Sequence, residues 1–346
     1  MPKTYNNLWE GIIGWDNLYT AYLEARKRKR YKAGVLRFNA NLEENITNIQ
    51  NHLMWGSWRP SKWKEFMVYE PKRRLIQAPP FKDRVVHHAL ASVISPLFER
   101  KFIFDSYACR QGKGFHQAAK RVQTFLQKAR VDGETTYVLK ADISKYFHSI
   151  DHDALSRIFS RTIRDERVLA LSNHIIRDAE FDKCGIPLGS LTSQIYANIY
   201  LDQLDHYVKD TLGVKYYCRF MDDFIIVCND KKYLWLLLSE IEHFLTNKLK
   251  LTLNPKTAIF PSVRGVDFCG YRVWVNHILP RKKNIRRARR SFAKLTRAYS
   301  KGEVSLEKVK ACIMSFLGYT KHCNSYITTQ NILNETILRR SKCKSE

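Results

Sequence analysis

Residues 219–227 constrain the fold of this chain more than any other stretch, because two adjacent carboxylates interrupt an apolar run that resumes at once. Residues 216–220 and 224–228 have the β-branched and aromatic composition of strands, and Asp222-Asp223 favours a turn between them. The sequence therefore predicts a hairpin with two negative charges at its tip. A rigid acidic tip can bind divalent cations beside a phosphate, although an isolated Asp-Asp pair is more often a solvated turn.

The charge balance indicates a polyanionic partner. The chain has 59 Lys and Arg against 33 Asp and Glu, a formal net charge of +26, while 45% of its 346 residues are hydrophobic. Such an excess in a folded protein is typical of nucleic-acid binding. A polybasic membrane protein is the alternative, but no apolar run approaches the roughly 20 residues that span a bilayer, and the first residues carry no signal-peptide pattern. We expect a nucleic-acid partner, no membrane and a cytoplasmic location.

The cysteines argue against a common type of zinc site. Eight of them are scattered along the chain without a CxxC pair, which excludes the usual zinc-knuckle spacing. This usage fits reduced thiols in a cytosolic protein, most of them small core residues.

Periodicity and composition divide the chain into three parts. Residues 1–60 are expected to form a basic helical extension, and the cationic run 26–30 within it is either a phosphate-contacting arm or a solvated helix end. Residues 61–275 mix helices with strands, and 276–346 are basic and helical. We expect helices over 15–32, 42–55, 81–100, 115–130, 191–212, 231–249, 281–301 and 306–317, and strands over 65–69, 74–78 and 137–142, near 258 and within 267–275.

A third carboxylate, Asp142, ends the predicted strand 137–142. A site for two-metal phosphoryl transfer needs carboxylates from neighbouring strands, so that two Mg²⁺ ions lie about 3.5–4 Å apart. Asp142 together with Asp222 and Asp223 meets this requirement. Asp151 or Asp153, in contrast, is expected to cap the helix that follows.

The chain resembles reverse transcriptases of the bacterial and phage kind, because seven of their segments occur in the same order. These are residues 71–86, 105–114, 140–151, 185–194, 220–223 (Phe-Met-Asp-Asp), 253–257 and 268–271, followed by the thumb pattern at 316–319. The resemblance covers roughly residues 60–275. It implies an α+β right-hand polymerase fold, with fingers, a palm of antiparallel sheet plus helices (core about 136–150 and 195–275) and a small helical thumb. It also implies an RNA-directed DNA polymerase acting on deoxynucleoside triphosphates.

The resemblance assigns roles to individual residues. Asp142, Asp222 and Asp223, with the Ile143 backbone carbonyl, would hold two Mg²⁺ ions, for which Mn²⁺ could substitute in vitro. Phe147 lies five residues after Asp142, at the position whose ring excludes a 2′-hydroxyl and so selects deoxynucleotides; a plain core aromatic is the alternative.

Basic residues are assigned by the same resemblance. Arg74 and Lys72 would clamp the triphosphate, and Lys256 would lie near the primer or triphosphate, with ordinary surface placement as the alternative. The 276–346 region would grip the RNA/cDNA duplex through phosphate contacts. The residues assigned to this grip are Arg281, Lys282, Lys283, Arg286, Arg287 and Arg290.

The fourth segment departs from the commoner Gln-Gly-x-x-x-Ser-Pro pattern, since it reads Leu188-Gly189-Ser-Leu-Thr-Ser-Gln194. Leu188 replaces a polar side chain near the incoming nucleotide, which removes a directional contact and should weaken discrimination. Gln194 replaces a proline and restores a backbone N–H, and Gly189 belongs to the same nucleotide-binding segment.

This aliphatic form resembles the enzymes of diversity-generating retroelements. Those enzymes copy a template-repeat RNA with errors chiefly opposite adenine, for mutagenic retrohoming, together with a small basic oligomeric accessory protein. Two alternatives remain: an intron-type or antiphage-defence reverse transcriptase of ordinary fidelity, and a catalytically silent RNA-binding scaffold.

Overall fold

A four-stranded antiparallel sheet carries the predicted carboxylates. The computed structural model, which describes residues 3–69, 72–177 and 183–339, orders the strands β4-β5-β3-β6. Along β5, Phe224 and Ile226 enter the main core, while Ile225 and Val227 enter a second core on the other face. This strict alternation explains why the hairpin sequence is apolar throughout, because both faces are buried. The strands are β3 (Tyr137–Asp142), β4 (Tyr217–Phe220), β5 (Asp223–Cys228) and β6 (Ala258–Pro261).

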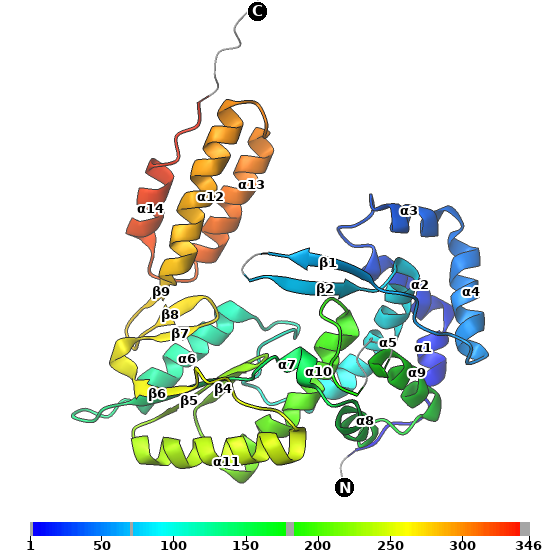
Figure 1. The fold of residues 1–346 in the computed structure, drawn as a ribbon, viewed down its shortest axis with the longest axis horizontal. Coiled ribbons are helices and arrows are strands. Elements are labelled where there is room, and N and C mark those ends of the chain that lie inside the picture. The colour runs from blue at the N-terminus through cyan, green and yellow to red at the C-terminus, as the bar shows by residue number, and fades with distance from the viewer. Residues whose placement is uncertain (1–2, 70–71, 178–182, 340–346) are drawn as a thin grey trace, which may run out of the picture.

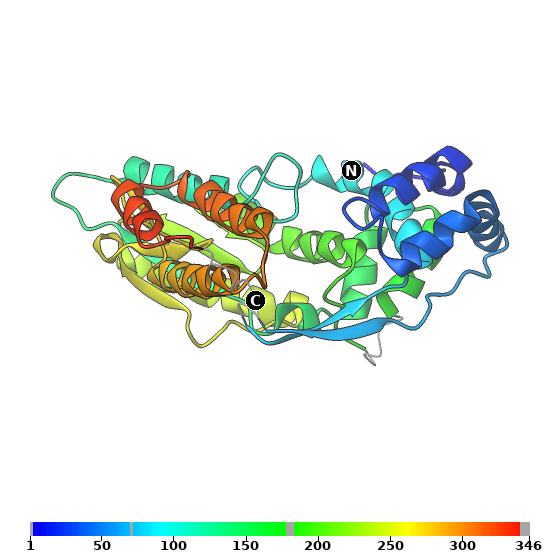
Figure 2. The same ribbon diagram turned by 90° about the horizontal axis from the view of Figure 1, so that it is seen from above.

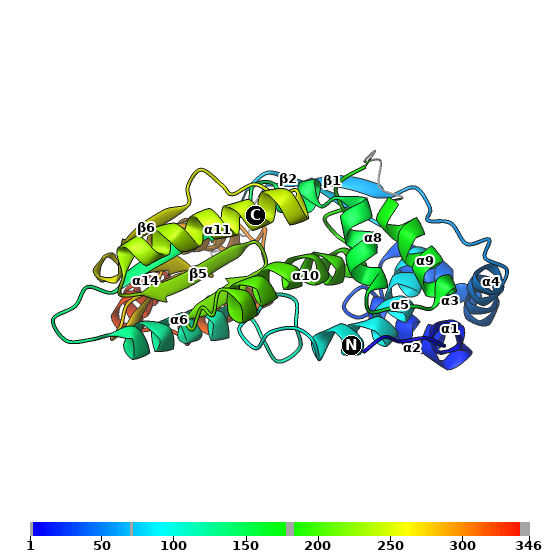
Figure 3. The ribbon, with the colours of Figure 1, turned by 90° about the horizontal axis from the view of Figure 1, so that it is seen from below.

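Helices cover both faces of this sheet. Helix α11 (Lys231–Leu249) lies across the face that is turned away from the C-terminal helices, as the view from below shows (Figure 3). Helix α6 (Phe115–Ala129) packs on the opposite face, where Val122 and Phe125 share the second core with Ile225 and Val227. We call the sheet with α6 and α11 the palm.

A small sheet joins the palm to three C-terminal helices, which we call the thumb. The sheet contains β7 (Val266–Phe268), β8 (Tyr271–Val273) and β9 (Ile278–Pro280), and the helices are α12 (Lys282–Ser300), α13 (Leu306–Thr320) and α14 (Tyr326–Asn334). Phe292, Phe316 and Ile332 form a separate small core inside the thumb. At its base, the Tyr319 hydroxyl donates to the Gly270 carbonyl. The thumb therefore stands above the palm on one narrow attachment (Figure 1).

The other end of the molecule is a helical layer with a projecting hairpin. The hairpin runs between the two ends of the molecule when seen from above (Figure 2). Its strands are β1 (Lys64–Val68) and β2 (Arg74–Ala78). The helices of this layer are α1 (Trp9–Ile13), α2 (Trp15–Ala25), α3 (Ala33–Ala40), α4 (Leu42–Met54), α5 (Phe81–Glu99), α8 (His152–Ser160) and α9 (Glu166–Arg177). Between this layer and the palm lie α7 (Tyr146–Ser149) and α10 (Leu191–His206), the latter continued by a π-helical turn, Tyr207–Thr211 (Figure 1).

Most predicted elements are present. The helix predicted over 306–317 runs on to Thr320, and the strand region 267–275 forms two strands. Two further boundaries differ from expectation for a clear physical reason. The helix predicted over 15–32 ends at Ala25, and the cationic run after it forms turns in which Arg28 has φ 59°. Five adjacent cations repel one another, which disfavours a continued helix. At the hairpin, Asp223 belongs to β5 and pairs with Phe220, so the turn consists of Met221 and Asp222 rather than of the two aspartates.

Two further expectations can be compared with the fold. Asp151, rather than Asp153, caps α8, since its carboxylate accepts the Ala154 N–H at 2.8 Å. The cysteines within the described residues are all free, but Cys218 alone among them is buried, so the expectation that most are core residues is wrong. Cys343 lies outside those residues. Among the described helices, none combines the length and apolar character needed to cross a bilayer.

Candidate active site

The sheet brings Asp142 and Asp223 directly opposite each other. Their Cα positions pair in the register of β3 and β5, and Asp222 occupies the adjoining turn, whose carbonyl accepts the Ile143 N–H at 3.2 Å. Met221 takes a left-handed backbone conformation with φ 57°, a strained state for a side chain of this size. The tight turn thus places three carboxylates, predicted from separate segments, at one edge of the palm.

A buried ion pair supports this turn from behind. Arg219 is fully buried, and its Nε and Nη2 atoms contact the two Asp205 carboxylate oxygens at 2.6 and 2.5 Å. Its Nη1 atom donates to the Met221 carbonyl at 2.9 Å, and the Tyr217 hydroxyl donates to Asp205 Oδ1 at 2.7 Å. Bidentate arginine–carboxylate contacts fix the orientation of the side chains and also stabilise the fold. Arg219 therefore holds the strained turn in place.

The carboxylates are held close together in surroundings that disfavour their charge. Burial and the neighbouring Asp142 raise the pKa of Asp222 to about 6, while Arg74 opposes that shift. Burial raises the pKa of Asp223 to about 7 against the opposing charge of Lys140, whose Nζ lies 3.5 Å from Asp223 Oδ2. Negative charge concentrated in a partly desolvated place favours a bound cation.

The donor set fits a hard divalent cation. The Oδ1 atom of Asp223 is buried without a hydrogen-bond partner, and such oxygens are the ligands that Mg²⁺ prefers. Asp142 Oδ2 accepts the Asn254 side-chain amide at 3.1 Å, which orients that carboxylate. Within residues 3–69, 72–177 and 183–339, however, no three acidic, His or Cys side chains converge closely enough to form a ready-made metal cluster.

Ile143 lies where its carbonyl is left available. It forms an isolated antiparallel bridge with Leu253, but the two hydrogen bonds of that bridge are donated by Ser144 and Asn254, at 2.9 and 2.7 Å. The Ile143 carbonyl takes part in neither of these two bonds. Its place directly after Asp142 is the one expected of a backbone ligand.

Two of the predicted nucleotide-binding residues, Phe147 and Leu188, form backbone hydrogen bonds at the two ends of one loop. Phe147 is half-buried in α7, where its ring lies 5.6 Å from that of Tyr146 and its carbonyl accepts the Ile186 N–H at 2.8 Å. Leu188 is half-buried, and its carbonyl accepts the Gln77 N–H of β2 at 2.9 Å. The loop 185–190 thus connects α7 to the projecting hairpin.

Gly189 allows this loop to approach β2 closely. It has φ +137°, and a Cβ atom added there would lie 2.6 Å from the Gln77 carbonyl oxygen and 2.9 Å from Ile76 Cγ2. A larger residue would therefore push the loop away from the hairpin. Gln194, at the other end of this segment, is exposed on the first turn of α10.

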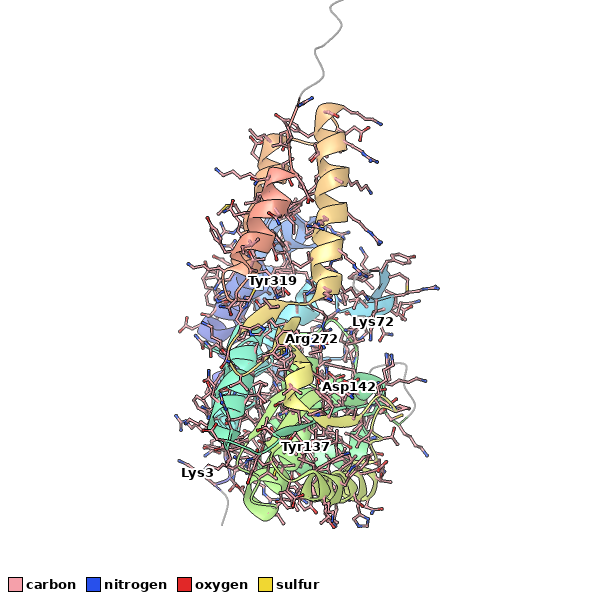
Figure 4. All side chains as sticks on the ribbon, turned by 90° about the vertical axis from the view of Figure 1, so that its left-hand side faces the viewer. Lys3, Lys72, Tyr137, Asp142, Arg272 and Tyr319 are labelled. Atoms are coloured by element: carbon pink, nitrogen blue, oxygen red, sulfur yellow. The ribbon has the colours of Figure 1, made fainter. Side chains whose placement is uncertain are left out.

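The predicted basic residues differ in how closely they approach the carboxylates. Arg74 is near enough for its charge to lower the pKa of Asp222, whereas Lys72 and Lys256 are exposed on loops. The Lys256 backbone N–H donates to Asn254 Oδ1 at 3.0 Å, so it stabilises the turn that bears Asn254. Figure 4 places Asp142 below the thumb helices and Lys72 at the end of the hairpin.

The thumb presents a basic groove of about 1310 Å³ between α12 and α13. Phe115, Gly270 and Tyr319 close the groove at the palm end. Arg281 instead turns toward the palm, where its Nε lies 3.5 Å from Asp267 Oδ1, and Lys282 is exposed. The basic residues of the groove lining are Lys283, Arg286, Arg287, Arg290, Lys294 and Lys308.

Sequence reasoning missed three supporting side chains: Arg219, Asp205 and Asn254. The position of Arg219 immediately before the acidic turn was visible, but its partner lies 14 residues earlier on α10. In the sequence, Asn254 is part of the segment 253–257, and no local pattern assigns it a role of its own. A basic residue inside an apolar, buried strand is the one sequence signal that indicates an internal ion pair.

Comparison with known proteins agrees with this geometry. Residues 64–273 match the family model described as reverse transcriptase (RNA-dependent DNA polymerase). Protein YkfC of Escherichia coli is 26% identical in an alignment of 280 residues, which covers 68% of this chain and 72% of YkfC. Group II intron-encoded protein LtrA of Lactococcus lactis is 22% identical in an alignment of 351 residues, which covers 80% of this chain and 58% of LtrA.

A solved structure shares the fold. Apo telomerase from Candida tropicalis superposes with a TM-score of 0.51 at 12% identity, over 84% of this chain and 64% of that one. The α+β right-hand polymerase fold expected from the sequence is therefore confirmed. The chain belongs to the reverse transcriptase (RNA-dependent DNA polymerase) family, and it is an RNA-directed DNA polymerase.

Proposed function

We propose that this polymerase makes cDNA from a template-repeat RNA with errors opposite template adenine, for mutagenic retrohoming in a diversity-generating retroelement. The observation that carries the proposal is Leu188, an aliphatic side chain where many reverse transcriptases have a polar one. Leu188 is half-buried in a loop bonded to the hairpin strand that bears Arg74. An aliphatic contact gives dispersion without direction, so mispaired nucleotides are rejected less strongly.

The carboxylates Asp142 and Asp222 would hold two Mg²⁺ ions, with Asp223 and the Ile143 carbonyl completing the ligands. The bound ions would activate the primer 3′-hydroxyl and neutralise the leaving pyrophosphate. Arg219 keeps the turn rigid, so that the Asp222 carboxylate stays aligned with Asp142. Asn254 orients the Asp142 carboxylate from the other side.

The remaining assignments concern the nucleotide and the nucleic acid. The Phe147 ring would exclude a 2′-hydroxyl, while Arg74 and Lys72 bind the triphosphate and Lys256 lies near the primer. Gly189 and Gln194 would shape the same nucleotide pocket. The RNA/cDNA duplex would lie along the thumb groove, with contacts from Arg281, Lys282, Lys283, Arg286, Arg287 and Arg290.

The proposal includes partners and a cellular setting. The template would be a template-repeat RNA, and a small basic oligomeric accessory protein would assist the enzyme. Synthesis would take place in the cytoplasm of a bacterium or of a phage-infected host. The support for this setting is the same Leu188-to-Gln194 segment.

The test is primer extension on a mixed-sequence RNA with Mg²⁺ and four deoxynucleotides, followed by deep sequencing of the products. The natural protein should misincorporate chiefly opposite adenine, and Leu188→Gln should lower that error frequency. Leu191→Gln, an identical exchange at a half-buried position three residues further along, should leave the spectrum unchanged. Equal spectra for the natural protein and Leu188→Gln would reject the role of Leu188.

A second candidate function is an intron-type reverse transcriptase of ordinary fidelity. The observation that favours it is the similarity to LtrA, a group II intron-encoded protein. The same sequencing separates the candidates, because this alternative predicts faithful cDNA without an excess of errors at adenine.

A further inference from the structure

A lysine of the palm sheet lies on the same face as two of the carboxylates. Side chains alternate between the two faces of a strand, and Val138 of β3 and Ile225 of β5 both enter the second core. By the same alternation, Lys140, Asp142 and Asp223 lie on this face. Lys140 pairs with Ile225, two residues along from the pairing of Asp142 with Asp223. Lys140 is therefore a diagonal cross-strand neighbour of Asp223, within reach of a long side chain.

The Lys140 ammonium group contacts two acceptors. Its Nζ atom lies 3.5 Å from Asp223 Oδ2 and donates to the Asp267 backbone carbonyl of β7 at 2.5 Å. The Asp267 carboxylate is turned to Arg281 instead, with 3.5 Å between Oδ1 and Nε. Within the described part of the chain, Asp223 is thus the carboxylate with which Lys140 forms an ion pair.

This lysine is held between the palm sheet and the small sheet at the base of the thumb. The side chains of Lys140 and Asp223 are 26% and 27% exposed, so water screens their attraction less than that of a surface pair. The same face is otherwise apolar, with Val227 and Phe268 in its core. A cation in such surroundings needs partners. The β7 carbonyl and the β5 carboxylate supply them and fix the position of Lys140.

The two carboxylate oxygens of Asp223 have different surroundings. Oδ2 is the atom nearest to the lysine, whereas Oδ1 is buried without a hydrogen-bond partner. A buried polar atom in a native structure normally has a partner. Because the ion pair restricts rotation of the carboxylate, it leaves Oδ1 as the oxygen that is available to a cation.

A lysine beside a metal site has two opposite effects on metal affinity. Its charge repels the cation, which weakens binding. Its contact with a ligand orients that ligand, which strengthens binding, because carboxylates that bind metals are themselves held by neighbouring groups. Removing the lysine therefore changes the affinity in a direction that shows which effect is larger.

We propose that Lys140 is a positioning residue that holds the Asp223 carboxylate so that Oδ1 can bind a divalent cation. This role rests on the assignment of Asp142, Asp222 and Asp223 as metal ligands under the proposed function. It does not depend on Leu188 or on where the enzyme makes errors. Lys140 binds no metal itself and acts through Asp223.

The test measures the Mn²⁺ affinity of the full chain without nucleic acid, at mildly alkaline pH, from the electron paramagnetic resonance signal of free Mn²⁺. Lys140→Met should weaken the affinity by about 10-fold to 100-fold, the usual loss when a group that orients a metal ligand is removed. A lysine that chiefly repels cations would give tighter binding. A purely structural ion pair would lower the melting temperature and leave the affinity unchanged. Either of these two results would overturn the proposal.

Two further variants test whether Lys140 acts through Asp223. Lys140→Gln keeps a donor for the Asp267 carbonyl but loses the charge, so it replaces Lys140→Met if that variant does not fold, and it should show the same loss. In an Asp223→Asn background, Lys140→Met should cause no further loss, because residues that act through one contact are not additive. Equal losses in both backgrounds would contradict the proposal.

Lys209→Met is the matched control. The Lys209 Nζ atom also donates to backbone carbonyls, those of Val214 and Lys215 at 2.9 and 3.0 Å. These residues precede β4, at the end of that strand remote from the acidic turn, so this variant should bind Mn²⁺ as the natural protein does.

Asp142→Asn tests the metal site separately from the lysine. An unchanged Mn²⁺ affinity in Asp142→Asn would overturn the metal assignment and the role of Lys140 together. A weakened Asp142→Asn beside an unchanged Lys140→Met would overturn the role of Lys140 alone.

Discussion

At the scale of single residues, the edge of the palm that bears the carboxylates combines a strained turn with a buried support. Met221 has an unfavourable backbone conformation, and Arg219 offsets it through a hydrogen bond to the Met221 carbonyl. The carboxylate of Asp222 is thereby held near Asp142 even though the two repel. Removing the Asp222 charge should relieve that repulsion and at the same time remove a proposed metal ligand.

We therefore expect Asp222→Asn to abolish primer extension without weakening RNA binding. Its melting temperature without metal should equal or exceed that of the natural protein, because a buried like-charge contact has been removed. Asp132→Asn, at a side chain that is 94% exposed in a distant turn, is the control and should keep full activity. Primer extension, RNA affinity and thermal melting give the three readouts. Retained extension by Asp222→Asn would contradict the metal-ligand assignment.

The sequence identified the three carboxylates but could not identify what holds them. Asp142, Asp222 and Asp223 stand out because acids interrupt apolar strands, which is a local signal. The Arg219–Asp205 contact connects β4 to α10, and contacts of this kind depend on packing that no local pattern encodes. The placement of Asp223 inside β5 was missed for a related reason, because turn propensity competes with pairing to β3.

At the scale of elements, the loop 185–190 is joined to the hairpin through one very close contact. Gly189 lies against the Gln77 carbonyl, and the adjacent Leu188 carbonyl accepts the Gln77 N–H. Strand β2 also carries Arg74. A substitution that moves the loop should therefore also displace strand β2.

Gly189→Ala should destabilise the protein by about 1–3 kcal/mol, the usual range for overpacking, and should raise the KM for deoxynucleotides by displacing β2. Gly112→Ala is the matched control. Gly112 also has a positive φ, +69°, but no atom lies within 4 Å of an added Cβ, so that variant carries backbone strain without a clash. Chemical denaturation and steady-state kinetics would check both effects. Similar losses in the two variants would mean that strain alone, and not the contact with Gln77, determines the outcome.

Helices with a long apolar periodicity were predicted correctly. Prediction failed for short elements and where a run of like charges ends a helix. Helices α5, α6 and α11 begin and end within a residue or two of expectation, since each has a long apolar stripe. Helix α2 stops before the cationic run. Helices α1, α3, α7, α9 and α14 were not predicted. Of these, α14 has just 9 residues and two of its side chains buried, a weak signal in sequence.

At the scale of the whole molecule, the thumb has a hydrophobic core of its own, separate from the cores of the palm. The thumb core contains Phe292, Phe316 and Ile332 and is distinct from the palm cores. Its groove carries several cations and, among the described lining residues, no carboxylate. Composition predicted the basic helix but not the groove, because the groove requires α13 to pack beside α12.

Neutralising Arg286, Arg287 and Arg290 to Gln should weaken binding to an RNA/DNA duplex. It should also flatten the salt dependence of the affinity by about 0.7–0.9 for each phosphate that is no longer neutralised. The control exchanges three exposed lysines of α11 for Gln: Lys231, Lys232 and Lys248. The net charge falls equally in both variants, so a general decrease in attraction affects both. Equal salt slopes in the two variants would show that the thumb groove is not the duplex site.

With the roles proposed for Arg74 and Leu188, the contact between Gln77 and the Leu188–Gly189 loop has a consequence for heredity. Arg74 lies three residues before Gln77 on the same short strand. Arg74, which would bind the triphosphate, and Leu188, which would contact the incoming nucleotide, would therefore move together. Selection for faster synthesis would then also alter the error frequency of the cDNA. In an enzyme built this way, synthesis rate and mutation rate would be inherited together.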